Sequence, residues 1–453
     1  MHEILEINHY LKVSKFSLLK FWDYYTLSNK FNINSYFQVV MFKEVIKHRK
    51  IFITINDEKE YKRCRVQLYG RGVVLRDLVL GKDILTKKQQ VCVKNDFIVA
   101  EIDAKFGGYG IVPAELNNAI VSSHYFLFEV NYKRILPDFL SILLKCKGFS
   151  KQVKSTGSTN YSAIRPYHVL NYLIPLPPLD KQQKFVDAYS QKNSEADYEM
   201  KKSRFKEQKI DSYLLDILGV KIKKSFKKTG LTFTKFSFID RWAADYLFNL
   251  NSIEGITQAK YQILKVKNIL LSYQYGLSSK AKVEPIGIPM LRMNNIINSE
   301  LNIENLKYIS LGKDLKERFL LDKGDMLFNR TNSKELVGKT AVFELDKEYT
   351  FASYLIRLKF DTEKVNVHFI NYLFNSPVGR VQIDIISRQV LGQANVNAQE
   401  LQDFIFPIPD LPTQNKIVNI ISKIKISVNA LKNKAELTRI EALNEFERAI
   451  FKN

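Results

Sequence analysis

The sequence predicts an α+β protein in which one α/β domain occurs twice and each copy is followed by a long helix. Three observations support this prediction: a proline-rich motif occurs twice, much of the remaining sequence aligns with itself, and two long segments lack both proline and glycine. A pseudo-twofold axis would relate the two copies, so we expect the two long helices to pack as an antiparallel coiled coil.

The duplicated motif marks equivalent positions in two halves of the chain. It reads IPLPPLDKQQKFV at 174–186 and FPIPDLPTQNKIV at 406–418. Other segments align in the same order: SKFSLLKFWDYY (14–25) with TKFSFIDRWAADY (234–246), VKNDFIVAEI (93–102) with DKGDMLFNRT (322–331), and the amphipathic stretches 137–153 with 367–383. Collinear matches at a nearly constant offset indicate a tandem duplication.

The segments that follow the two motifs predict long helices. Residues 179–218 and 413–451 contain neither proline nor glycine, and the prolines just before them suit helix starts. Selected positions in both segments recur at the three- and four-residue steps of a coiled-coil seam, and most of them are apolar. Two surface helices that pack separately on their own domains are the alternative. The seam residues that we single out are Val186, Tyr189, Met200, Ile210, Leu214, Ile417, Ile421, Ile424, Val428 and Leu431.

The repeat and the helices divide the chain into four parts: a first domain at 1–175, a central spacer helix at 176–222, a second domain at 223–408 and a C-terminal spacer helix at 409–453. Both domains contain short runs of β-branched and aromatic residues, such as FIVAEI and SYLIRLKF, which predict strands. We therefore expect α+β domains with twisted antiparallel sheet. A helix of about 38 residues spans about 57 Å, which is long enough to hold two domains apart.

The charge of the chain favours a polyanionic partner. Lysine and arginine outnumber aspartate and glutamate by 69 to 47, which gives a formal net charge of +22. This excess predicts binding to nucleic acid, although lysine-rich solvated surfaces would give the same count. Cys64, Cys92 and Cys146 are too scattered to indicate a disulfide framework or a zinc ribbon. The sequence shows neither an apolar run of about 18 residues nor a signal-peptide core, so we expect a cytoplasmic protein.

Two motifs that could carry chemistry are incomplete. FGGYG at 106–110 resembles a loop that binds S-adenosylmethionine, but a proline follows closely and the Asn/Asp-Pro-Pro-aromatic catalytic motif is absent. A loose metal-nuclease pattern is offered by Asp96, Glu101, Asp103 and Lys105. The aligned run GDMLFNRTNSK has no carboxylate before its lysine, and the sequence contains no phosphate-binding loop for ATP. We therefore expect a binding protein with no catalytic residue, metal site or cofactor of its own.

Arginine and asparagine residues gather in β-rich loops, where they suit contacts with DNA. Arginine can donate two hydrogen bonds to guanine, and asparagine can pair with adenine. Lysine and main-chain amides hold phosphates. Each residue alone is equally well explained as a solvated side chain or a fold contact, so the prediction rests on the cluster. The candidate DNA-binding residues are Arg63, Arg65, Arg71 and Arg76 in the first domain, and Arg292, Asn294, Asn295, Asn329, Arg330, Asn332 and Lys334 in the second.

The chain resembles the specificity subunits of bacterial type I restriction-modification systems over nearly its full length. The resemblance rests on GSTNYSAIRPYHVLNYLIPLPPLDKQQKFV, LLDKGDMLFNRTNSKELVGKTAVFEL and LRMNNII, and on GRGVVLRD, TKKQQ and AEIDAKFGGYGIVP in the first domain. The chain departs from the family in its turn motifs, where Asp180-Lys181 and Pro412-Thr413 stand where the family commonly has a glutamate before the glutamine. The two domains also have different lead-in sequences, so we expect two different DNA half-sites.

This resemblance implies that the two domains are target-recognition domains, each of which reads one half of a split double-stranded DNA site. The paired helices would act as a ruler and would dock two methyltransferase subunits, through which restriction subunits join. S-adenosylmethionine, ATP and Mg²⁺ are then expected on the partner subunits. Three alternatives stay open: a specificity partner of a fused methyltransferase-nuclease or of a phage-defence methyltransferase without restriction, a self-contained metal-dependent nuclease, and a scaffold that binds proteins.

Overall fold

The computed structural model describes residues 33–153, 163–222, 253–390 and 393–452, together with the short strands β1 (Glu6–Asn8) and β2 (Leu11–Lys12). The chain divides into two compact units, of which the first takes residues 1–200 and 432–453 and the second takes residues 201–431. The aligned segments 14–25 and 234–246 and the motif GSTNY at 157–161 lie outside the described residues.

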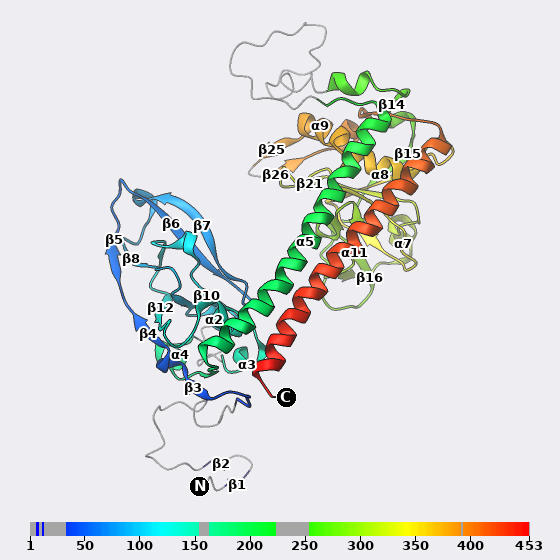
Figure 1. Ribbon diagram of the computed structural model, residues 1–453. Coiled ribbons are helices and arrows are strands. Elements are labelled where there is room, and N and C mark those ends of the chain that lie inside the picture. The colour runs from blue at the N-terminus through cyan, green and yellow to red at the C-terminus, as the bar shows by residue number, and fades with distance from the viewer. Residues whose placement is uncertain are drawn as a thin grey trace. The chain divides into compact units, whose positions relative to one another are not determined.

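The first unit contains a four-stranded sheet, a five-stranded sheet, two-stranded pairs and short helices (Figure 1). Its strands are β3 (Val39–Met41), β4 (Ile46–Arg49), β5 (Phe52–Thr54), β6 (Glu60–Gln67), β7 (Gly72–Leu80), β8 (Lys88–Val91), β9 (Phe97–Ala100), β10 (Tyr109–Ile111), β11 (Ile120–Val121), β12 (Tyr125–Val130) and β13 (Leu173–Pro175). Its short helices are η2 (Phe42–Glu44), η3 (Gly81–Asp83), η4 (Asp103–Phe106), η5 (Ala114–Leu116), α2 (Pro137–Leu143), α3 (Lys147–Ser150) and α4 (Pro166–Leu170). One sheet has the order β10-β9-β12-β4 and the other has the order β5-β8-β11-β6-β7.

The second unit repeats this arrangement with smaller sheets. Its strands are β14 (Ile263–Lys265), β15 (Leu270–Tyr275), β16 (Ile288–Leu291), β17 (Ile296–Ile297), β18 (Glu300–Leu301), β19 (Lys307–Ile309), β20 (Met326–Asn329), β21 (Thr331–Asn332), β22 (Thr340–Val342), β23 (Thr350–Phe351), β24 (Leu355–Phe360), β25 (Arg388–Val390), β26 (Gln393–Asn395) and β27 (Ile405–Pro407). Its short helices are η7 (Val266–Asn268), η8 (Met293–Asn295), α7 (Lys313–Phe319), α8 (Val367–Asn375), α9 (Pro377–Ile386) and α10 (Ala398–Gln402). The sheet orders are β15-β24-β20-β22, β19-β16-β23 and β21-β26-β25.

The two units share one topology. The antiparallel sheet β4-β12-β9-β10 corresponds strand by strand to β15-β24-β20-β22, and the pair β3-β13 corresponds to β14-β27. This correspondence agrees with the duplication and the α+β class that the sequence predicts. The sheets are mainly antiparallel, as expected, and they also contain two parallel pairs, in which β11 runs parallel to β6 and β23 runs parallel to β16. Both pairs join strands that are far apart in the chain, and such long connections permit parallel pairing.

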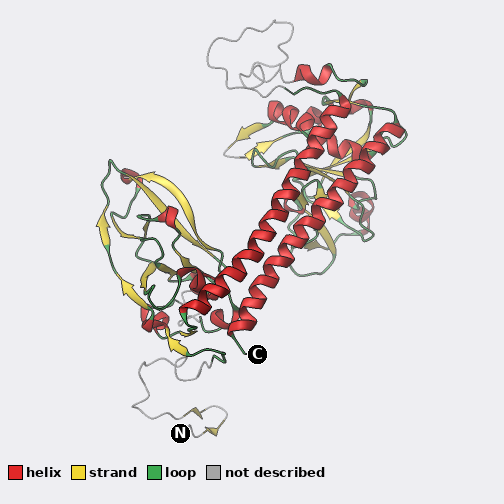
Figure 2. Ribbon diagram, in the orientation of Figure 1, coloured by secondary structure: helices red, strands yellow, loops and turns green. Residues whose placement is uncertain are grey.

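Two helices of 40 residues each follow the duplicated motif: α5 (Leu179–Leu218) and α11 (Leu411–Ile450) (Figure 2). In the first unit Lys192 pairs with Glu445 at 2.6 Å and Glu199 pairs with Lys434 at 2.7 Å. The residue number rises along α5 while it falls along α11, so the helices are antiparallel. None of the described helices is both long and apolar enough to cross a membrane.

The predicted seam residues are all buried or half-buried. Small residues lie between them, since Ala196, Ser203 and Ala435 are fully buried, and small side chains let two helices approach closely. The fully or nearly fully buried members of the predicted seam are Val186, Leu214, Ile417, Ile421 and Val428, and the half-buried members are Tyr189, Met200, Ile210, Ile424 and Leu431.

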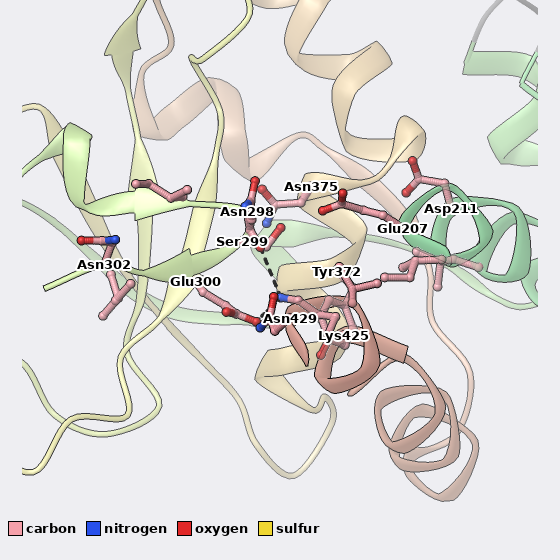
Figure 3. Close-up of a pocket in the computed structure, with 15 residues that line it drawn as sticks. Glu207, Asp211, Asn298, Ser299, Glu300, Asn302, Tyr372, Asn375, Lys425 and Asn429 are labelled. Carbon is pink, nitrogen blue, oxygen red and sulfur yellow. Dashed lines mark hydrogen bonds and ion pairs between the residues drawn. The ribbon is translucent and has the colours of Figure 1, made fainter. Parts of the chain in front are cut away.

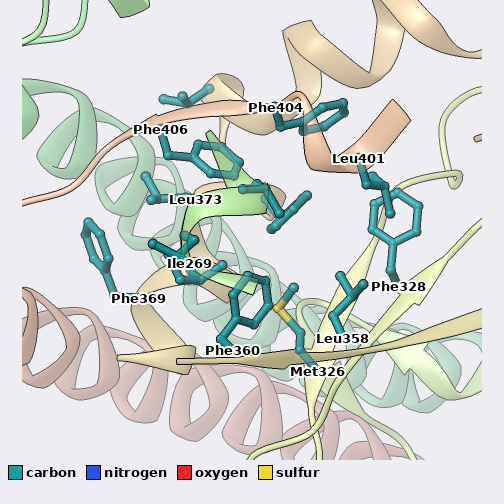
Figure 4. Packing of buried hydrophobic residues seen from close by; sticks show 14 of the residues in the cluster. Ile269, Met326, Phe328, Leu358, Phe360, Phe369, Leu373, Leu401, Phe404 and Phe406 are labelled. Carbon is teal, nitrogen blue, oxygen red and sulfur yellow. The ribbon is translucent and has the colours of Figure 1, made fainter. Parts of the chain in front are cut away.

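Each unit completes its hydrophobic core with the last turns of one long helix. Phe446 and Ile450 of α11 belong to the core of the first unit, where the rings of Phe446 and Phe139 are 5.4 Å apart. Leu214 and Leu218 of α5 belong to the core of the second unit. Figure 4 shows the centre of that second core, where aromatic side chains from the sheet and from α8 meet. The core of the first unit therefore depends on residues at the far end of the chain.

A buried glutamine occupies the same position in both copies of the duplicated motif, and its hydrogen bonds explain why both copies contain it. Gln182 donates hydrogen bonds to the carbonyls of Pro177 (2.8 Å) and Arg134 (3.0 Å), and it accepts one from the amide of Leu136 (2.8 Å). Gln414 makes the same three bonds in the second unit, with Pro409, Lys364 and Asn366. In both units this side chain joins the start of the long helix to the loop that precedes α2 or α8.

Candidate nucleic-acid interface

The candidate residues of the first unit lie on the hairpin of β6 and β7. Arg63 is half-buried and donates two hydrogen bonds of 2.7 Å to the carboxylate of Asp77. These bonds lower the pKa of Asp77 below its ordinary value and hold the guanidinium of Arg63 within the hairpin. Arg65, Arg71 and Arg76 are exposed. Three of the four arginines are therefore accessible to a phosphate or a base edge.

The turn of this hairpin packs on the FGGYG segment. The amide of Tyr69 donates to the carbonyl of Phe106 (2.7 Å), and the amide of Gly70 donates to the carbonyl of Gly107 (3.0 Å). Gly107 has a φ of +77°, and a Cβ there would lie 2.8 Å from the nitrogen of Gly70. Only glycine tolerates this backbone and this approach. The glycines thus serve the packing of two turns that position the arginine-rich hairpin.

Two candidates of the second unit are buried. Asn295 is 2% exposed, and its side chain accepts from the amide of Arg292 (3.0 Å) and donates to the carbonyl of Asn302 (2.8 Å). Asn329 is 1% exposed and donates to the carbonyl of Leu336 (3.4 Å). Both amides hold loops in place, and a base contact from either would require those loops to rearrange.

The other candidates of the second unit reach the surface. Asn294 and Lys334 are exposed, whereas Arg292, Arg330 and Asn332 are half-buried. Arg292 donates to the carbonyl of Asn305 over 2.7 Å. The guanidinium of Arg330 lies over the ring of Tyr275, 4.9 Å from its centre. An aromatic ring beneath a guanidinium restrains its orientation through the cation–π attraction.

A main-chain junction fixes the position of Arg330. This residue follows β20; its amide donates to the carbonyl of Tyr354 (3.0 Å), and its carbonyl accepts from the amide of Val396 (3.0 Å). We call this group of three segments the second junction. Three parts of the unit that are distant in sequence therefore meet at one arginine.

The first unit has the same junction at Glu101. The amide of Glu101 donates to the carbonyl of His124 (2.9 Å), and its carbonyl accepts from the amide of Ile164 (3.0 Å). We call this group the first junction. The carboxylate of Glu101 pairs with Arg165 (2.5 Å) and with Nδ1 of His124 (2.9 Å). Neither Arg165 nor His124 stands out in the sequence, although the match of VKNDFIVAEI with DKGDMLFNRT places Glu101 opposite Arg330.

Two acidic residues of the metal-nuclease pattern, Asp96 and Glu101, pair with cations of the chain itself. Asp96 is buried beside Arg49, and burial raises the pKa of its carboxyl above the ordinary value. Its counterpart Asp325 lies 3.5 Å from Arg357 and 3.2 Å from Lys359. Within the described residues, no group of three or more His, Cys, Asp and Glu side chains is arranged to hold a metal ion.

The three cysteines are buried thiols. The sulfurs of Cys64 and Cys92 are 3.6 Å apart, beneath the sheet that carries the arginine-rich hairpin. The contact with Cys64 and the burial of both side chains raise the pKa of Cys92. Cys146 lies in the main core of the first unit, where burial raises its pKa as well. These thiols contribute to packing.

A cavity of about 370 Å³ lies in the second unit beside the hairpin of β17 and β18 (Figure 3). Lys425 of α11 pairs with Glu300 (2.6 Å) and donates to the carbonyl of Asn298 (3.2 Å), so the hairpin is tied to the long helix. The side-chain amide of Asn371 on α8 donates a hydrogen bond to the carbonyl of Ser299, the residue after Asn298 (3.1 Å). The cavity is lined by amides and carboxylates together with aliphatic side chains. Its contacts hold the hairpin against α8 and α11.

Comparison with known proteins places this architecture in one family. The family model of the type I restriction modification DNA specificity domain matches residues 34–199 and again residues 244–442. The chain is 27% identical over 197 residues to a protein of Methanocaldococcus jannaschii named as the type I restriction enzyme MjaX specificity subunit, which covers 42% of this chain and 44% of that protein. It is 22% identical over 367 residues to the type I restriction enzyme EcoKI specificity subunit of Escherichia coli, which covers 77% of this chain and 71% of that one.

A solved structure of a type I restriction-modification system contains a chain with the same fold. The two chains superpose with a TM-score of 0.51 at 16% identity, over 92% of this chain and 97% of the other. The family model covers well over half of the sequence and matches it twice, once in each half. The chain therefore belongs to the type I restriction-modification DNA specificity family.

Proposed function

We propose that this chain supplies the DNA sequence specificity of a type I restriction-modification complex, and that each unit reads one half of a split site. The observation that carries this proposal is one scaffold present twice with different side chains at equivalent positions. Glu101 in the first junction and Arg330 in the second occupy the same main-chain position, yet they carry opposite charges. Two copies of one scaffold with different surface chemistry are suited to reading two different half-sites.

The arginine, asparagine and lysine candidates that reach the surface are the proposed DNA contacts. In the first unit these are Arg65, Arg71 and Arg76, and in the second they are Arg292, Asn294, Arg330, Asn332 and Lys334. Arginine and asparagine suit base edges, and lysine suits phosphates. The net charge of +22 adds a salt-sensitive affinity for any DNA sequence. Arg63, Asn295 and Asn329 support these contacts from within the fold.

The long helices are the proposed docking site for methyltransferase subunits. Large apolar side chains are exposed on both helices, including Tyr198 and Phe205 of α5 and Ile426, Leu437 and Ile440 of α11. Exposed apolar residues along a helix are typical of protein–protein interfaces. Two methyltransferase subunits would bind here, because the helix pair carries the duplicated motif twice, and restriction subunits would join through them.

Chemistry is assigned to the partner subunits in this proposal. Methylation of a base within a duplex requires that the base be flipped into a pocket, and that pocket would belong to the methyltransferase. S-adenosylmethionine, ATP and Mg²⁺ would bind the partners as well. The contribution of this chain is to choose the DNA site and to hold the partners on it.

Selection of bound duplexes from a random DNA library tests the proposal. The full-length chain should enrich two short blocks of defined sequence separated by a gap of fixed length and undefined sequence. Its affinity should fall steeply with salt, since each phosphate contact releases counterions and adds about 0.9 to the slope of log K against log salt. Enrichment of a single continuous block, or an affinity that salt does not change, would refute the assignment.

A further inference from the structure

The two junctions present one guanidinium each, but from different places in the sequence. At the second junction the guanidinium belongs to Arg330 itself and is supported by the ring of Tyr275. At the first junction the equivalent residue is Glu101, and its carboxylate supports the guanidinium of Arg165. Arg165 directly precedes Pro166, the first residue of α4. Each junction thus carries one arginine whose guanidinium is supported by another side chain of the junction or beside it.

The surroundings of Arg165 suit a residue that contacts a ligand. Its side chain is 56% exposed, whereas the carboxylate of Glu101 beneath it is only 14% exposed. The main-chain amide of Arg165 donates to Nδ1 of His168 (3.0 Å), so the backbone is fixed at the start of α4. The ring of His124, which is 73% exposed, binds the other oxygen of Glu101. The guanidinium is held at one end and open to solvent at the other.

A guanidinium held in this way loses little conformational freedom when it binds. An arginine side chain that is free in solution gives up much of its rotamer entropy on forming a contact, and a carboxylate that already fixes its direction reduces that loss. The remaining N–H groups of Arg165 can form the paired hydrogen bonds that guanine O6 and N7 accept. Glu101 restrains the direction of the Arg165 guanidinium, as the ring of Tyr275 restrains that of Arg330.

We propose that Arg165 is a specificity-determining residue of the first half-site, positioned by Glu101, and that it takes the place that Arg330 takes in the second. This inference rests on the proposed function, because it requires each unit to read its own half-site. The ligand group is a base edge with two hydrogen-bond acceptors, as guanine has in the major groove. Glu101 is a positioning residue and does not itself contact the base.

The test uses the full-length chain and the same selection from random duplexes. Arg165→Ala should lose the preference at one base pair of the first block by about 5- to 150-fold, while the second block stays unchanged. Arg165→Lys should bind DNA about as strongly as the original chain but should lose the same base preference, because lysine lacks the planar fork. Arg330→Ala should show the mirror result in the second block only.

A double-variant cycle tests the part assigned to Glu101. Glu101→Ala should weaken the same base preference as Arg165→Ala, and the double variant should be no weaker than Arg165→Ala alone, because the two residues act as a unit. A merely structural role would give additive losses and an altered thermal melting temperature.

The matched control is Arg134→Ala. Arg134 is also exposed and also pairs with a glutamate, Glu44 (3.5 Å), but it follows the opposite end of β12 from the junction. Arg134→Ala should leave the base preferences in both sequence blocks unchanged. If Arg165→Ala keeps every base preference, or weakens all sequences equally as a phosphate contact would, this inference is overturned while the proposed function stands. If the original chain enriches no split motif, both are overturned.

Discussion

The two units have the same scaffold but differ in the sheets beside it. The first unit carries a five-stranded sheet with a long hairpin of β6 and β7, and the second carries a three-stranded sheet with the small sheet β21-β26-β25. Certain buried polar residues recur at equivalent positions of the two units, as Asp96 and Asp325 do. The half-buried residues at the junctions differ, as Glu101 and Arg330 do. The two units therefore share buried polar contacts and differ in the side chains at their junctions.

The hydrophobic cores of the two units can be compared in the same way. Phe446 completes the first core and Leu214 completes the second, and each of these residues lies near the C-terminal end of a long helix. The two residues are equivalent positions of the repeat, 232 residues apart. Each unit consequently needs a helix end that the sequence alone would assign to a separate spacer.

The largest effect is expected when either helix end loses its core side chain. Phe446→Ala should destabilise the first unit by about 3–5 kcal/mol, and Leu214→Ala should destabilise the second by about 2–5 kcal/mol, because each leaves a cavity in a packed core. Hydrogen exchange followed by mass spectrometry should show faster exchange in β9 and β12 for Phe446→Ala and in β20 and β24 for Leu214→Ala.

Leu437→Ala is the control for this pair, since Leu437 is on α11 and exposed. It should change the free energy of unfolding by less than about 0.5 kcal/mol. If Phe446→Ala accelerated exchange equally in both units, the cores would not be separate in the way that the comparison requires.

The next effect concerns the buried glutamines. Gln182→Leu removes the partners of two carbonyls and one amide, and an unpaired buried polar group costs about 1–3 kcal/mol. We expect a loss of about 3 kcal/mol in urea unfolding, and a similar loss for Gln414→Leu because its bonds are the same. Gln183→Leu, at the exposed neighbouring position, should have little effect. A large difference between the two glutamine variants would show that the units use the motif differently.

Sequence reasoning reaches the repeat, the two long helices and the α+β class because these depend on local patterns. Proline–leucine turns, heptad spacing and β-rich runs are visible in a few residues each. The parallel pairs β6-β11 and β16-β23 are not, since they join strands that local patterns do not relate. The predicted Ile421 at the seam is also a core residue of the second unit, a double role that spacing cannot reveal.

The candidate site is harder to predict because burial decides which polar residues are accessible. Asn295 and Asn329 have the right side chains for adenine, but the fold uses their amides to hold loops. Arg63 differs from Arg65 only in having Asp77 opposite it across the hairpin. Arg165 is separated from Glu101 by 64 residues, so their ion pair appears only in three dimensions.

The smallest expected effect distinguishes a cation that contacts DNA from a cation elsewhere on the surface. Arg65→Ala removes one exposed cation from β6, on the larger sheet that distinguishes the first unit. If this residue holds a phosphate, the slope of log K against log salt should fall by about one, and affinity should drop equally for all sequences. Lys423→Ala removes the same charge from an exposed position on α11 and should leave the slope unchanged. Equal slopes for both variants would mean that Arg65 does not contact a phosphate, and Arg71 and Arg76 would then be the proposed DNA contacts of this hairpin.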